Sequence, residues 1–110
     1  MDSFNVIISP KALSQLNNYI DYLQYTLLND QAAYNLWQDA LETRKQLSKV
    51  AGSLKFCTHP KLKKNGYRVI NFMRHRYLML YRIEATNVYV DAIYHQLQDY
   101  ENAFVDELSH

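Results

Sequence analysis

The sequence is poor in the residues that support several common kinds of site. It contains one cysteine, Cys57, and only two glycines and two prolines among 110 residues. A single cysteine cannot form an internal disulfide, and one cysteine among four scattered histidines does not make a zinc-binding pattern. No phosphate-binding loop pattern is present. We therefore expect no disulfide, no metal ion and no cofactor.

Long apolar runs are also missing. No run approaches the roughly 20 residues that a membrane-spanning helix needs, and the opening MDSFNVIISP lacks the basic and apolar regions of a signal peptide. With 48% hydrophobic and 21% charged residues, the composition is ordinary for a globular protein. We expect one domain over residues 1–110, with a single core, in the cytoplasm and without a membrane contact.

Acidic residues are absent between Glu42 and Glu84, and this gap polarises the chain. The stretch holds 11 of the 12 basic residues, so its local charge is +11, whereas the other segments together carry −10. Such a field concentrates and steers anions, which predicts a polyanion or an acidic protein as the partner. The alternative is an ordinary solvated surface, although surfaces usually mix charges of both signs.

Helical spacing predicts two helices after a short first strand. Residues 4–9 are β-rich and end at Ser9 and Pro10, which suit an N-cap and the first helical position. Apolar residues then recur every three or four positions over residues 10–28 and, after a cap at Asp30, to about residue 51. Because the link is so short, the two helices must pack as an antiparallel hairpin.

The second half of the chain predicts strands. Residues 53–66 lack periodicity and suggest an irregular basic loop, whereas three β-rich runs at 67–72, 77–83 and 88–94 with short links predict an antiparallel meander. Residues 97–108 have the spacing of a last helix. The predicted class is α+β: an N-terminal strand and an antiparallel helical hairpin packed on a twisted antiparallel sheet, in the order β-α-α-β-β-β, with a possible C-terminal helix.

Strand alternation predicts which face of the sheet the hairpin covers. The side that carries Arg68 and the side that carries His95 are the more polar ones, so we expect them to be open to solvent. The Val-rich side of the last strand should lie against the helices. A register shift of one residue would invert this assignment. The residues expected on the open face are Arg68, Ile70, Phe72 and Arg74 of one strand and Tyr89, Asp91, Ile93 and His95 of the other.

Four stretches together resemble the RelE/ParE superfamily of toxins from type II toxin-antitoxin systems. They are VIISPKALSQL near the N-terminus, the strands YRVINF and YLMLYRIE, and the ending VDAIYHQLQDYENAF, in which a strand ends in His95 and Tyr100 follows five residues later. The similarity covers essentially the whole chain. It implies a toxin that inhibits bacterial growth and is neutralised by a small acidic antitoxin, in a toxin-antitoxin hetero-oligomer. The antitoxin's helix or strand should lie across the hairpin and the sheet edge.

Two mechanisms occur in that superfamily: RelE-like toxins cut mRNA on the ribosome without a metal, and ParE-like toxins poison DNA gyrase. RelE-like nucleases carry an arginine after the aromatic residue of the third strand, where this chain has Leu78 after Tyr77. Their C-terminal motif is arginine-rich, whereas this one has Gln96 and Gln98. With the long hairpin, these differences favour gyrase poisoning. Ribosome-dependent mRNA cleavage and a non-catalytic binding module remain alternatives.

Cleavage of RNA needs proton transfer and cations beside the phosphorane. Matching positions to the family implies His95 and Tyr100 for proton transfer and Arg68 for charge, although each of these residues also suits a structural role. Tyr77 would stack on a base, with packing in the core as its alternative. Six basic residues complete the predicted surface for a nucleic acid or another target: Lys61, Lys63, Lys64, Arg74, Arg76 and Arg82.

Overall fold

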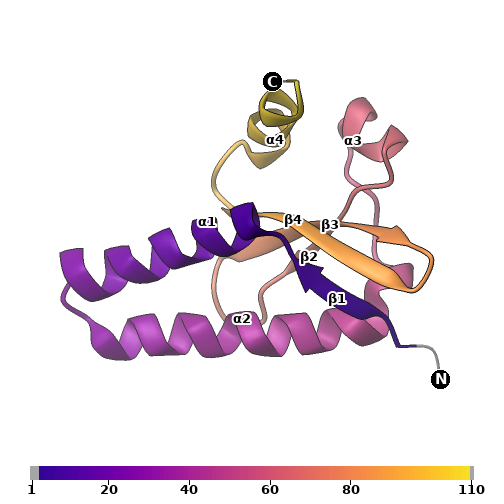
Figure 1. Ribbon diagram of the computed structural model, residues 1–110. Coiled ribbons are helices and arrows are strands. Elements are labelled where there is room, and N and C mark those ends of the chain that lie inside the picture. Colours follow the sequence, from indigo (N-terminus) through magenta and orange to yellow (C-terminus); the bar gives the residue numbers. More distant parts are fainter. Residues whose placement is uncertain (1–2, 110) are drawn as a thin grey trace.

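The structure is a computed structural model and describes residues 3–109. Ten elements follow one another along the chain, and Figure 1 shows their arrangement. They are β1 (Asn5–Ile8), α1 (Pro10–Asp21), η1 (Tyr22–Thr26), α2 (Asp30–Val50), η2 (Ala51–Ser53), α3 (Pro60–Lys64), β2 (Arg68–Asn71), β3 (Tyr77–Glu84), β4 (Asn87–His95) and α4 (Tyr100–Leu108). The predicted hairpin, meander and final helix are therefore all present.

The hairpin begins with the predicted cap. Ser9 accepts a hydrogen bond from the backbone N–H of Ala12 at 3.0 Å, and Pro10 is the first helical residue. The second cap lies one residue earlier than expected, because Asn29 accepts from the N–H of Ala32 at 2.9 Å and Asp30 is already helical. A carboxylate at the first helical position still interacts favourably with the helix dipole.

The sheet has four strands in the order β1-β4-β3-β2. The meander from β2 through β3 to β4 is antiparallel, as predicted. The first strand joins β4 in parallel, so the sheet is mixed and β1 forms one of its edges. The parallel pairing follows from the connection, since two helices separate β1 from the meander and return the chain to the same end of the sheet.

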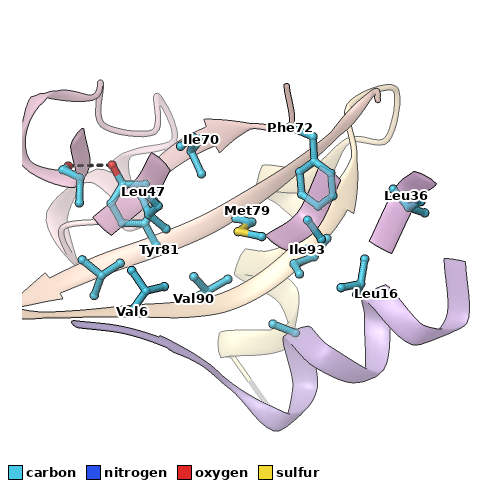
Figure 2. Packing of buried hydrophobic residues seen from close by; sticks show 14 residues of the cluster. Val6, Leu16, Leu36, Leu47, Ile70, Phe72, Met79, Tyr81, Val90 and Ile93 are labelled. Carbon is cyan, nitrogen blue, oxygen red and sulfur yellow. Dashed lines mark hydrogen bonds between the residues drawn. The ribbon is translucent and has the colours of Figure 1, made fainter. Parts of the chain in front are cut away.

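The hairpin packs on one face of the sheet, which we call the hairpin face. Figure 2 shows Leu16 and Leu36 of the helices against Met79 and Ile93 of the strands. Ile70 and Phe72 belong to the same cluster, so the prediction that the Arg68 side of β2 is open to solvent is wrong. The prediction treated Arg68 as a solvent-exposed residue, but backbone carbonyls at the margin of the core hold its guanidinium.

A β-bulge divides the alternation of β4 into two parts. Leu80 pairs with Ala92 while Tyr81 pairs with Val90, so Asp91 is an extra residue on β4. Before the bulge, Val88 and Val90 face the hairpin, as predicted. After it, Ile93 faces the hairpin, contrary to prediction. An inserted residue moves every later side chain to the other face of the strand.

The second face of the sheet is covered instead of open. Leu62 of α3 and Phe104 of α4 pack there with Tyr67, whose ring meets that of Phe104 edge-on at 5.0 Å between centroids. The predicted irregular loop at 53–66 therefore includes a helix, which turns Leu62 inward. It also includes an isolated bridge between Phe56 and Arg68. No helix in the described part of the chain is long and apolar enough to span a membrane.

Candidate functional site

Six lysines of the basic stretch remain exposed, and we call them the basic end. They lie on the C-terminal half of α2, in the segment after it and on α3, which Figure 1 shows toward the end of the molecule opposite to the α1–α2 turn. Exposed Arg76 lies apart from them, in the link between β2 and β3. The exposed lysines thus gather toward one end, and the carboxylate of Glu101 lies beside them, where it accepts from Thr58 and from the N–H of His59. The basic end consists of Lys45, Lys49, Lys55, Lys61, Lys63 and Lys64.

Arg68 is engaged within the fold. Its Nη1 donates to the carbonyl oxygens of Gly52 at 3.1 Å and Leu54 at 2.7 Å, and its guanidinium stacks over Phe56 at 4.0 Å from the ring centroid. These contacts hold η2 and the segment after it against β2. An arginine with two donors and one face occupied has limited freedom to reach a phosphate.

Arg82 is also paired. Its Nε donates to Oδ2 of Asp91 at 2.9 Å, and its Nη1 lies 2.7 Å from the carboxylate of Glu84. Tyr67 donates its hydroxyl to the same Asp91 oxygen at 2.7 Å. Burial and this bond to Asp91 raise the pKa of Tyr67 to about 12. The residue that creates the bulge in β4 therefore also neutralises one predicted target-binding cation.

Arg74 and Arg76 lie in the link between β2 and β3, and Asp39 of α2 organises that link. Asp39 is 1% exposed and accepts the backbone N–H groups of Met73, Arg74 and His75 at 2.8 to 3.1 Å. It also lies 2.7 Å from Nδ1 of His75. These contacts repay the cost of burying a carboxylate and fix the backbone that carries both arginines.

Sequence reasoning missed Asp39, although a signal was present. The residue lies three positions after Leu36 and just before Ala40, inside the apolar stripe of α2. A charged residue on the buried side of a helix requires partners, and the free N–H groups of a tight link are suitable ones. Arg74, by contrast, pairs with the exposed carboxylate of Glu42.

His95 ends β4 within an aromatic cluster. Its ring meets Tyr77 edge-on at 5.0 Å, and Tyr77 packs against Tyr19 at 4.7 Å. Nδ1 of His95 accepts the N–H of Leu97 at 3.1 Å, so in the neutral ring Nε2 carries the hydrogen. Burial raises the pKa of Tyr77. The neutral His95 ring can therefore offer a hydrogen-bond donor at Nε2.

Tyr100 lies on the second face, as the first residue of α4. It packs against the cluster around Leu62 and Phe104, and burial together with the carboxylate of Glu101 raises its pKa. His95 lies with Tyr77 on the hairpin face. The sheet thus separates the two residues proposed for proton transfer.

Arg68 does not join either of them. It pairs with Tyr81 on β3, whereas His95 pairs with Tyr77, so the two positions are four residues, or roughly 13 Å, apart along the strand. The structure therefore does not bring the three predicted catalytic residues together. Within residues 3–109, no group of three histidine, cysteine or acidic side chains is placed to hold a metal ion.

An apolar furrow runs between β1 and the hairpin. Its volume is about 420 Å³. Ile7, Leu13, Trp37 and Leu41 are partly exposed along it, and the guanidinium of Arg44 lies at its rim, where Nη2 donates to the carbonyl of Val6 at 3.1 Å. A concave apolar surface with a cation at its margin suits an amphipathic protein segment.

The fold and these surfaces define the class of protein: a small α+β domain with an apolar furrow and a separate basic end, in which Arg68, His95 and Tyr100 lie apart. A solved structure described as the chromosomal ParDE TA system from P. aeruginosa shares this fold. The TM-score is 0.69 at 20% sequence identity, and the match covers 84% of this chain and 96% of that chain.

The sequence itself matches the family model described as the ParE toxin of the type II toxin-antitoxin system, parDE, over residues 6–100. The chain therefore belongs to the ParE toxin family. No curated protein sequence matches it. Membership in a toxin-antitoxin family implies an antitoxin partner, and it confirms the resemblance that the four stretches indicated.

Proposed function

We propose that this protein is a growth-inhibiting toxin that poisons DNA gyrase in the cytoplasm and is silenced by an acidic antitoxin. The observation that carries the proposal is the ParE family match over residues 6–100. Two features of the molecule support gyrase over mRNA as the target. Arg68, His95 and Tyr100 do not converge on one point, and the position after Tyr77 holds Leu78 in place of a cation.

The antitoxin docks in the furrow and on the free edge of β1. The N–H groups of Asn5 and Ser9 bond toward β4, to Thr86 and Val90 respectively. Alternate residues of a strand point their N–H groups to opposite sides, so those of Val6 and Ile8 point to the free edge. An extended antitoxin segment can add a strand there if it displaces Arg44 from the carbonyl of Val6, which faces the same edge.

The cations beside the furrow predict an acidic antitoxin segment. Arg44 lies at the rim of the furrow, and Lys45 lines the adjoining hollow with Phe4 and Ser48. Carboxylates on the antitoxin would meet both cations, while its apolar side chains cover Leu41 and Trp37. Pairing of this kind gives specificity and a fast encounter in addition to the burial of apolar surface.

The test begins with expression of the chain alone and together with a short acidic protein encoded beside it. We expect growth arrest in the first case and relief in the second. Purified protein should inhibit supercoiling by DNA gyrase and leave ribosome-bound transcripts intact. Replacement of His95 by Ala and of Tyr100 by Phe should leave gyrase inhibition unchanged.

Other results would exclude parts of the proposal. Cleavage of transcripts that is lost in the His95 and Tyr100 variants, with supercoiling untouched, would establish the RelE-like activity instead. Binding to the acidic protein without any growth arrest would identify a non-catalytic binding module. Leu41→Asp should abolish relief by the antitoxin but preserve toxicity, and relief that persists in this variant would exclude the furrow as the docking site.

A further inference from the structure

The turn between α1 and α2 exposes a concentration of large apolar side chains, which we call the hairpin tip. Its four members are Tyr22, Tyr25, Leu27 and Leu28, and Tyr25 is 69% and Leu28 82% exposed. Single apolar residues on a surface need no explanation, but two tyrosines and two leucines within seven consecutive residues form a patch. The furrow residues do not include these four.

The backbone of the tip holds this patch in an unusual conformation. Residues Tyr22–Thr26 form a π-helix, closed by a bond from the N–H of Leu27 to the carbonyl of Tyr22 at 3.0 Å. Leu28 then adopts a left-handed conformation with φ of 52°. π-Helical turns are rare and frequent at functional sites, and a bulky residue at positive φ is strained. A glycine or asparagine would fit position 28 at lower cost than this leucine does.

The charge around the tip narrows the choice of partner. No lysine or arginine occurs between Lys11 and Arg44, and the charged residues beside the tip are Asp21 and Asp30. Nucleic acid needs cations to neutralise phosphates, so it does not fit this surface. Two copies of the tip would bring four carboxylates together around one apolar contact, which disfavours self-association.

We infer that the hairpin tip binds the protein that this toxin inhibits, at an apolar patch on that protein edged by lysine or arginine. This inference rests on the proposed function and adds the contact through which the target is held. Aromatic side chains that stand clear of a surface are typical binding anchors. Figure 1 places the tip at the end of the molecule opposite to α3, so the basic end stays free when the tip is engaged.

The experiment compares a tip variant with a matched control. Tyr25→Ser combined with Leu28→Asn removes two anchors, and asparagine tolerates the left-handed backbone at position 28. Leu97→Ser is the control, since Leu97 is a leucine outside the tip and is similarly exposed, at 76%. The control should unfold at nearly the wild-type Tm, and the tip variant at the same Tm or slightly above it, because asparagine relieves the backbone strain at position 28. Binding to purified DNA gyrase, measured by biolayer interferometry, should weaken about 30-fold or more in the tip variant, with matching loss of supercoiling inhibition. The control should bind like the wild type.

Each other outcome has a definite meaning. Equal gyrase binding by the tip variant and the wild type overturns the inference. The inference is also overturned if the wild type sediments as a dimer and the tip variant as a monomer, because the tip would then bind a second copy. If the wild type does not bind gyrase, the proposed target is wrong, and growth arrest then tests whether the tip binds another target.

Growth arrest by the wild type and the control but not by the tip variant supports a contact with a different protein target. Growth arrest by the tip variant overturns the inference. A wild type that neither binds gyrase nor arrests growth refutes both proposals.

Discussion

The two faces of the sheet are covered in different ways. The hairpin face lies under α1 and α2, which are 12 and 21 residues long and share a large cluster with β2, β3 and β4. The second face lies under α3 and α4, of 5 and 9 residues, and its cluster is smaller. Long amphipathic helices gain most of their stability from such packing. From this difference we expect the hairpin face to set global stability and the cover of the second face to open at a lower free energy.

The largest expected effect comes from Asp39, which ties α2 to the link between β2 and β3. Asp39→Ala leaves the partly buried N–H groups of residues 73–75 without an acceptor, and we expect a loss of about 3 kcal/mol in the free energy of unfolding. Urea unfolding followed by circular dichroism measures this. Glu42→Ala is the control on the same helix, because Glu42 pairs with Arg74 at the exposed surface and its loss should change stability very little. Equal effects of the two changes would show that Asp39 is not the anchor.

The contrast between the faces also shows which structural features a sequence pattern can predict. The hairpin was predictable because caps and a spacing of three and four residues are local properties. The Ser9 cap and the spacing are present as predicted, and the second cap lies one residue earlier, at Asn29. The faces of the strands were less predictable. The bulge at Asp91 is invisible to an alternation argument, and Arg68 looks like a surface residue until the carbonyls of Gly52 and Leu54 are in place.

The candidate sites show the same distinction between local features, which the sequence predicts, and tertiary features, which it does not. The exposure of Lys61, Lys63 and Lys64 follows from a local basic run, and their role in target binding stays a prediction. The positions of His95 and Tyr100 relative to each other depend on how β4 and α4 pack, which is a tertiary property. For the same reason, neither the furrow nor the partners of Asp39 can be derived from spacing alone.

A smaller difference in stability is expected between Phe substitutions of two buried tyrosines, one from each cluster. Tyr81 donates its hydroxyl to the carbonyl of Ala51 at 2.8 Å in the hairpin-face core. Tyr94 belongs to the other cluster, and within the described residues its buried hydroxyl makes no well-formed hydrogen bond. Burial raises the pKa of Tyr94, and the nearby Gln15 side chain lowers it by a smaller amount. Tyr81→Phe should therefore cost about 1 kcal/mol, whereas Tyr94→Phe should be neutral or stabilising. Urea midpoints of both variants against the wild type provide the measurement, and a larger loss for Tyr94→Phe would contradict it.

The smallest effect concerns pH and the single thiol. Burial raises the pKa of Cys57 from 9.0 to about 12, so the folded protein holds this proton while the unfolded chain begins to release it. The stabilisation is fully present below pH 9 and is lost as the pH rises toward 12, since the unfolded state then binds fewer protons than the folded state. Burial also raises the pKa of Tyr81, from 10.0 to about 12, and this residue adds a parallel decline that begins one unit later. The urea midpoint of the wild type should therefore be lower at pH 10 than at pH 8, and this decrease should be smaller in Cys57→Ala. An identical decline in both proteins would mean that the second face already admits water to the thiol, which would remove the difference in packing between the two faces at this position.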